Sequence, residues 1–275
     1  MTRSETGYVV YPGTKLYYEV DGDGSALTLI HAGVAHLRMW DAQVAAFKDR
    51  YTVVRYDERG FGQTQTEDVQ YSNATDLLQL LDHLAIDRTH LVGNSRGGSI
   101  ALDFALSHPD RVRSLTLVGS GISGFDVDDP RLIDVWPEIE RLWEAKEYDK
   151  VVELETQIWT DGPGQPSTRV DPQVRRRMVD WNLENYKADQ EADQVQKLDP
   201  PAVGRLGEVK IPTMVIWGRL DTADTNAAGE KMAAEIRGAK SHVFPDVAHM
   251  VSLEKPAEFN MLLADFLAQV EAGAS

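Results

Sequence analysis

The sequence predicts an α/β fold: a mostly parallel sheet with helices on both faces and an inserted helical cap. Three observations predict it. Compact apolar runs typical of buried strands alternate with apolar residues at helical spacing over residues 26–118. The alternation stops over residues 124–208, where only helical patterns follow, and it resumes at residue 212. A glycine-rich turn at residues 93–97 joins a predicted strand to a predicted helix.

The first part of the chain has the order expected of parallel strands joined by helices. Short β-branched and aromatic runs flank Pro12-Gly13, which indicates an opening hairpin. The strand–helix alternation that follows implies right-handed crossovers. The predicted elements are a hairpin of residues 7–11 and 15–20, strands at 26–31 and 51–57, a helix at 73–84, a strand at 91–92, a helix at 96–107 and a strand at 113–118.

The middle of the chain is predicted to be an insertion between two halves of one sheet. Helical patterns cover residues 132–143, 148–159 and 172–186, and a Gly/Pro-rich turn at 161–166 separates the last two. Strand and helix then alternate again at residues 212–218, 226–237, 241–244 and 256–268. We therefore expect one core domain, formed by residues 1–123 and 209–275, and a cap segment of residues 124–208.

The composition narrows the classes of partner. The chain has 275 residues, 44 acidic and 28 basic side chains, and a net charge of −16. This charge argues against nucleic acid and anionic membranes as partners. The absence of cysteine excludes disulfides, thiolate metal sites and a cysteine nucleophile. No segment has the length of a membrane span, and the N-terminus lacks the apolar core of a signal peptide, so we expect a cytoplasmic protein. Monomer and homodimer both stay open.

The motif with chemical content is Gly93-Asn94-Ser95-Arg96-Gly97, which matches the G-x-S-x-G nucleophile turn with a strand before it and a helix after it. Side chains at Gly93 or Gly97 would clash in such a sharp turn. Ser95 then stands at the amino end of the helix, where backbone N–H groups favour a developing anion. We predict that Ser95 is a nucleophile; the alternative is a purely structural glycine-rich turn.

A serine hydroxyl needs a base, and the base needs an acid to orient it. Asp221 follows the strand at residues 212–218, and His249 precedes the final helix, so acid and base follow Ser95 in the order typical of this turn. We expect Asp221 to be the acid and His249 the base. Asp221 could instead cap a helix, with Asp224 as competing acid, and His36 is an alternative base.

Backbone N–H groups of Arg96 and Gly33 are the expected oxyanion hole, since one donor follows the nucleophile and the other comes from the loop after the strand at 26–31. We expect His31 to fix this loop. The Arg96 side chain either lines the pocket or forms a structural ion pair. The residues predicted for the substrate pocket are His36, Trp136, Trp159 and Met250, although a tryptophan at helical spacing is more often part of a core.

Further motifs carry a family resemblance over nearly the whole chain: His31-Ala32-Gly33, Asp57-Glu58-Arg59-Gly60-Phe61-Gly62, Trp217-Gly218-Arg219-Leu220-Asp221 and Ala248-His249. With these motifs the sequence resembles the α/β-hydrolase superfamily, in its branch of capped esterases and lactonases similar to 3-oxoadipate enol-lactonases and carboxylesterases. The resemblance implies the α/β-hydrolase fold and a Ser-Asp-His triad that uses no cofactor and no metal. Two features depart from the pattern: Ala32 replaces a glycine, and Val247-Ala248 precedes the histidine without one.

The resulting expectation is a serine hydrolase that cleaves a carboxylic ester or lactone through an acyl-enzyme. Carbon–carbon bond hydrolases of aromatic degradation share the Gly-Asn-Ser-x-Gly-Gly form, but usually carry tryptophan after the histidine, where this chain has Met250-Val251. We rank that chemistry second. A low-turnover ligand receptor on the same fold and a perhydrolase are further alternatives.

The distribution of charge along the chain bears on the charge of the substrate. The cap segment holds 20 acidic and 11 basic side chains, so it carries 9 of the 16 excess negative charges. If it surrounds the entrance, it repels anionic substrates, and this repulsion weakens as salt screens it. We therefore expect a small, neutral ester or lactone as substrate.

Overall fold

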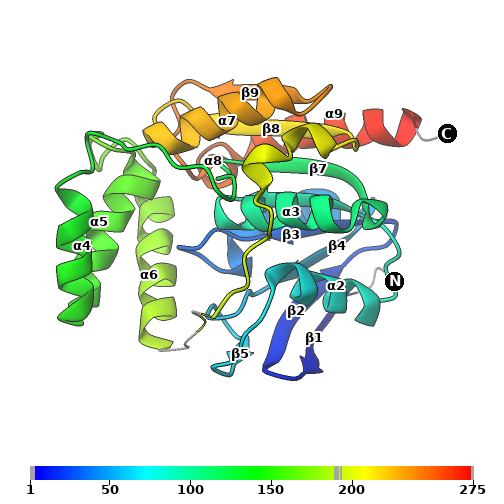
Figure 1. Cartoon of the computed structure of the whole chain (residues 1–275), viewed down its shortest axis with the longest axis horizontal. Helices are drawn as coiled ribbons and strands as arrows, with labels where there is room; N and C mark the ends of the chain where they lie inside the picture. Colours follow the sequence, from blue (N-terminus) through cyan, green and yellow to red (C-terminus); the bar gives the residue numbers. More distant parts are fainter. Residues whose placement is uncertain (1–3, 189–191, 193, 274–275) are drawn as a thin grey trace.

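The computed structural model describes residues 4–188, 192 and 194–273. Within them a nine-stranded sheet forms the centre of the molecule (Figure 1). Its main path runs β1-β2-β4-β3-β6-β7-β8-β9, and β5 pairs with β2. The strands are β1 (Ser4–Tyr11), β2 (Thr14–Asp21), β3 (Ser25–Ile30), β4 (Tyr51–Tyr56), β5 (Gln65–Thr66), β6 (Thr89–Asn94), β7 (Val112–Val118), β8 (Thr213–Gly218) and β9 (Lys240–Phe244).

The opening hairpin is antiparallel, and the rest of the path from β4 to β9 is parallel. Gly13 adopts a φ of 87° in the hairpin turn, a conformation that favours glycine. Every residue of β6 and β8 is buried, as expected for parallel strands covered on both faces. Because parallel strands end at the same edge of the sheet, the loops that follow β3, β4, β6, β7 and β8 meet there.

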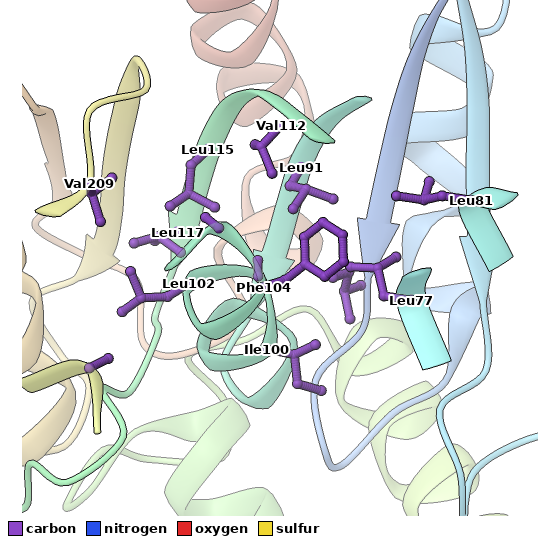
Figure 2. Packing of buried hydrophobic residues seen from close by; sticks show 14 of the residues in the cluster. Leu77, Leu81, Leu91, Ile100, Leu102, Phe104, Val112, Leu115, Leu117 and Val209 are labelled. Carbon is purple, nitrogen blue, oxygen red and sulfur yellow. The ribbon is translucent and has the colours of Figure 1, made fainter. Parts of the chain in front are cut away.

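Helices cover both faces of the sheet. On one face, α2, α3 and α7 bury residues such as Leu77, Phe104 and Ala228 against the strands. Figure 2 shows this packing, with side chains of α2 and α3 pointing toward those of β6 and β7. On the other face, α1 and α9 contribute Val44 and Phe259. The helices of the core are η1 (Leu37–Trp40), α1 (Asp41–Phe47), α2 (Asn73–His83), α3 (Arg96–Ser107), η2 (Pro109–Arg111), α7 (Ala223–Glu235), α8 (Val251–Glu254) and α9 (Pro256–Gly273).

The helices of the cap segment stand together beside the sheet, at the left of Figure 1. They are α4 (Val135–Glu144), α5 (Tyr148–Thr156), a π-helical turn η3 (Gln157–Asp161) and α6 (Pro172–Ala188). Asn185 on α6 fastens this group to the core: its Oδ1 accepts from the Gly62 N–H at 3.2 Å and its Nδ2 donates to the Ala35 carbonyl at 2.9 Å. One cap helix therefore bonds to two loops at the carboxyl edge of the sheet.

The last part of the predicted cap segment lies on the core. Two short helices, η4 (Ala202–Gly204) and η5 (Leu206–Glu208), place Ala202 and Leu206 in the core cluster with the strands. The Ala202 N–H also donates to Ser123 Oγ at 2.9 Å. The return segment is thus packed against the sheet domain, away from α4 and α5.

The predicted fold class is confirmed, and the predicted strands and long helices agree with those observed within a few residues. Two short helices, α1 and α8, were not predicted, because seven and four residues are too few to show helical periodicity. Among the described residues, no helix is both long and apolar enough for a membrane span.

Candidate active site

Ser95 occupies the sharp turn between β6 and α3. Its φ of 57° and ψ of −119° lie outside the conformations that side-chain-bearing residues prefer, and its N–H donates to the Val118 carbonyl at 2.8 Å. The flanking glycines make the turn sterically feasible. A Cβ on Gly93 would lie 2.1 Å from the Gly97 carbonyl oxygen, and one on Gly97 would lie 2.4 Å from that of Ile30. The half-buried serine is therefore held at the carboxyl edge of the sheet.

His249 and Asp221 form a buried hydrogen-bonded pair. His249 Nδ1 lies 2.6 Å from Asp221 Oδ2, and the residues are 3% and 1% exposed. Asp221 Oδ1 accepts from the Thr222 N–H at 2.7 Å. With the proton assigned to Nδ1 by this network, His249 Nε2 is left as an acceptor. The competing carboxylate of Asp224 accepts from the Val127 N–H instead, so Asp221 is the acid that faces the histidine.

Ser95 and His249 border the same strand end. The Ser95 N–H bonds to the last residue of β7, Val118, and the next residue, Gly119, leaves room for the imidazole. A Cβ on Gly119 would lie 3.3 Å from His249 Nδ1, and the φ of Gly119 is 50°. The structure thus brings the three predicted residues Ser95, Asp221 and His249 to one edge of the sheet.

The loop after β3 approaches the start of α3. A Cβ on Gly33 would lie 3.4 Å from Arg96 Cδ, so the two predicted oxyanion donors belong to neighbouring segments. Buried His31 fixes this loop, as predicted. Its Nδ1 lies 2.8 Å from the Ala32 carbonyl, and its Nε2 accepts from the Glu58 N–H at 3.0 Å. These bonds assign the Nδ1–H tautomer.

The Arg96 side chain forms an ion pair. Its Nε donates to Glu58 Oε2 at 2.7 Å, and Glu58 is 2% exposed. The guanidinium also lies 5.5 Å from the ring centre of Phe61. Of the two predicted roles for this side chain, the structure supports the ion pair. Arg96 also lines a cavity of about 440 Å³ that is bordered by the start of α2, by α3 and by residues 195–199.

One predicted pocket residue, Trp159, lies against the histidine, and a second, Trp136, lies against Trp159. The ring centres of Trp159, on η3, and His249 are 4.7 Å apart with an interplanar angle of 43°. Trp136 on α4 lies 6.0 Å from Trp159 and is 42% exposed. Met250, by contrast, has no exposed surface and packs in the core cluster with Phe259, so it does not line an accessible pocket.

His36 lies elsewhere, against α6. Its ring centre is 5.3 Å from that of Trp181, and its Nε2 is 3.8 Å from Glu184. Burial lowers the pKa of His36 to about 4, so it is neutral at physiological pH. It lines a separate cavity of about 250 Å³ with Asp57 and other residues of the loops after β3 and β4. The structure therefore does not bring His36 into contact with Asp221 or Trp159.

An ion pair that the sequence did not reveal supports the acid. The Asp129 carboxylate accepts from the Arg131 guanidinium at 2.9 and 2.6 Å and from the Ala223 N–H at 2.8 Å. Arg131 also donates to the Asp221 carbonyl at 3.1 Å. Hydrogen bonding by Arg131 lowers the pKa of Asp129 to about 2. No motif in the sequence indicates this pair, because its partners follow β8, 90 and 94 residues away.

Asn94, directly before the serine, is also unusual. It is fully buried, and within the described part of the chain neither its Oδ1 nor its Nδ2 has a hydrogen-bond partner. The described part of the chain contains no group of three or more His, Asp or Glu side chains that could hold a metal ion.

The site as a whole combines a strained serine with a histidine–carboxylate pair. This arrangement is suited to nucleophilic attack on a carbonyl.

Comparison with known proteins places this geometry in a family. A model of the alpha/beta hydrolase fold matches residues 26–256. This chain belongs to the alpha/beta hydrolase family. The enol-lactonase of Burkholderia xenovorans has a similar structure, with a TM-score of 0.75 and 29% identity over 95% of this chain and 99% of that protein. The predicted resemblance to this superfamily is thereby confirmed.

Curated relatives of this alpha/beta hydrolase are named as hydrolases of dienoates. The 2-hydroxy-6-oxo-6-phenylhexa-2,4-dienoate hydrolase of Comamonas testosteroni is 31% identical over 92% of this chain and 91% of the relative. A 2-hydroxy-6-oxononadienedioate/2-hydroxy-6-oxononatrienedioate hydrolase of Paraburkholderia phymatum is 33% identical over 95% and 94%. Both names describe carbon–carbon bond hydrolases, and both substrates are carboxylates.

These relatives contradict the expected ester or lactone hydrolase with a neutral substrate, and they favour the chemistry that was ranked second. The ranking rested on Met250, which stands where carbon–carbon bond hydrolases usually have tryptophan. In the structure Met250 is in the core, and an indole ring lies against His249 from the cap residue Trp159. The aromatic neighbour of the histidine comes from another segment.

Proposed function

We propose that this protein hydrolyses the carbon–carbon bond between C5 and C6 of a 2-hydroxy-6-oxo-dienoate. The observation that carries the proposal is the similarity, over more than nine-tenths of both chains, to hydrolases named for such dienoates. The pairing of His249 with Asp221 behind the strained Ser95 supports it, since the same groups that attack an ester carbonyl can attack a ketone.

The substrate must change form before the bond breaks. A proton moves from the 2-hydroxyl to C5, which gives the 2,6-dioxo tautomer with a double bond between C3 and C4. In this form, electrons that leave the C5–C6 bond spread through C4 and C3 to the 2-oxo oxygen. The leaving group is therefore a stabilised dienolate, and no metal or redox cofactor is required to balance the step.

The residues then act in sequence. His249 Nε2 takes the Ser95 proton, and Ser95 Oγ bonds to C6 and gives a tetrahedral oxyanion. The N–H groups of Arg96 and Gly33 stabilise that oxyanion. The C5–C6 bond breaks, and the proton on His249 passes to the dienolate, which yields 2-hydroxypenta-2,4-dienoate. Water, activated by His249, releases the remaining acyl group from Ser95 as a carboxylic acid. Asp221 stabilises the imidazolium throughout.

The test is a product analysis with the purified protein. Incubation with 2-hydroxy-6-oxo-6-phenylhexa-2,4-dienoate should bleach the conjugated chromophore and yield benzoate and 2-hydroxypenta-2,4-dienoate in equal amounts. The nonadienedioate should be tested in parallel and would yield succinate. Ser95→Ala should lower kcat by at least about 10³-fold while the protein stays folded. Intact dienoates after prolonged incubation with folded wild-type protein would refute the proposal.

A further inference from the structure

Under the proposed function, the group attached to C6 is the variable part of the substrate. From the names of the two relatives, this group is a phenyl ring in one, and a carboxyethyl or carboxyvinyl chain in the other. The C6 carbonyl must lie at Ser95 and His249, so its substituent must extend from them. What lies next to His249 therefore bears on which substituent this protein accepts.

The surface that leads away from His249 is aromatic. Trp159 lies 4.7 Å from the His249 ring, centre to centre, and Trp136 lies 6.0 Å from Trp159. Trp159 is half-buried and Trp136 is 42% exposed, so the two indoles extend from the histidine toward solvent. Their planes are tilted by 43° and 41° along this row, so the three rings form one run of tilted aromatic contacts.

Arg169 holds the backbone of the segment that follows Trp159. Arg169 donates to the carbonyls of Thr160 and Asp161, the two residues after Trp159, at 2.7 Å each. It also donates to the Asp246 carbonyl at 2.9 Å and to Glu254 at 2.5 Å.

The other end of this network reaches the base. The second carboxylate oxygen of Glu254 accepts from the N–H of Ala248, the residue before His249, at 3.1 Å. The guanidinium of Arg169, which is 14% exposed in its side chain, thus joins the segment of the cap tryptophan to the loop of the histidine. A ring so fixed loses little further entropy when a ligand packs on it.

The charges disfavour a second carboxylate at this position. In the described part of the chain, no arginine or lysine lies over either tryptophan ring. The cap segment holds 20 acidic against 11 basic side chains. A carboxyethyl group placed here would lose hydration, and Arg169, the cation that bonds to the residues after Trp159, is already paired with Glu254. A phenyl ring would gain aromatic contacts instead.

We infer that Trp159 and Trp136 form a subsite for an aryl group on C6, so that the substrate class is the 6-aryl-2-hydroxy-6-oxo-dienoates. This inference rests on the proposed function. Trp159 is the specificity-determining residue of the subsite.

The experiment compares kcat/KM for the 6-phenyl dienoate and for the nonadienedioate. Wild-type protein should prefer the 6-phenyl substrate. Trp159→Ala should lower kcat/KM for this substrate about tenfold more than for the nonadienedioate, the order expected for one lost aromatic contact. Trp159→Phe should recover most of the loss. Trp143→Ala is the matched control, because Trp143 is another exposed cap tryptophan but packs on Tyr148 and Tyr186.

Preference of the wild type for the nonadienedioate, or an equal loss with both substrates in Trp159→Ala, would overturn the inference. Failure of the proposed function gives a different result, in which neither dienoate is cleaved. Calorimetric titration with benzoate and succinate then decides the subsite separately. Benzoate should bind more tightly than succinate, and its Kd should rise about tenfold in Trp159→Ala. Equal affinities, or a Kd for benzoate that Trp159→Ala leaves unchanged, would overturn the subsite as well.

Discussion

At the scale of single residues, three glycines make the sharp turn at Ser95 possible. Gly93, Gly97 and Gly98 would each bring a Cβ within 2.6 Å of a neighbouring atom, and for the first two that atom is a backbone oxygen. Backbone atoms of packed strands cannot move aside as a flexible side chain can. Because these three glycines have no Cβ, β6, α3 and the loop after β3 can approach one another this closely.

Gly93→Ala should therefore destabilise the protein by about 1–3 kcal/mol, the usual cost of overpacking, and should abolish turnover because Ser95 moves. The free energy of unfolding in urea and kcat measure the two effects. Gly204→Ala is the control, since a Cβ there meets no atom within 4 Å. We expect that variant to stay within about 0.5 kcal/mol of the wild type. Similar destabilisation of both variants would contradict this account.

Local signals explain why Ser95, Asp221 and His249 could be predicted from the sequence. Ser95 and Asp221 follow the buried strands β6 and β8, and His249 follows the edge strand β9. Parallel strands deliver such residues to one edge of the sheet. Arg169 and Asp129 could not be predicted in the same way. Arg169 finds a partner 77 residues away and Asp129 one 94 residues away, and nothing in the intervening sequence fixes those distances.

At the scale of elements, the fold of the cap decides what its aromatic residues do. The sequence predicts one helix through Trp159, whereas the observed α5 ends at Thr156 and continues as a π-helical turn. The wider turn changes the direction in which later side chains point, so helical spacing alone cannot tell core from pocket here. Trp159 meets both descriptions, because it packs against the core cluster around Phe259 and also lies against His249.

The start of the cap segment is tied to the loop after β8 by Asp129. Its pKa is about 2 in the folded protein, compared with 3.8 ordinarily, because Arg131 bonds its charged form. As the pH falls, the unfolded chain binds a proton at Asp129 before the folded protein does. The stabilisation by this carboxylate is therefore complete well above pH 4 and is lost between about pH 4 and pH 2.

Asp129→Asn should lower the free energy of unfolding at pH 7 by about 1–3 kcal/mol, the range for hydrogen bonds to a charged group. The difference between variant and wild type should shrink steadily as the pH approaches 2. Urea unfolding at pH 7, 4 and 3 measures it. A difference that stays constant with pH would show that the charge of Asp129 is not the source of the stabilisation.

At the scale of the whole molecule, the net charge of −16 opposes the approach of a dienoate, which is itself an anion. Salt should reduce this repulsion, since the screening length falls from about 30 Å at 0.01 M to about 8 Å at 0.15 M. We expect kcat/KM for the 6-phenyl dienoate to rise by a factor of about two to ten over this range. The methyl ester of the same dienoate, measured by its carbon–carbon cleavage, should respond by less than about twofold. An equal response of both compounds would contradict the role of net charge.

The two bonds of Asn185 have a consequence for the order of folding. They join α6 to partners 123 and 150 residues earlier in the chain, and both partners lie in loops that exist only once the sheet has formed. Closing such long loops is slow, so the cap helices should dock after the core has assembled. The same contacts should open first in native-state hydrogen exchange, so amides of α5 and α6 should lose protection before those of β6 and β8. The strands that precede Ser95 and Asp221 should thus fold before the cap helices, which contain the proposed substrate-specificity residues, dock onto them.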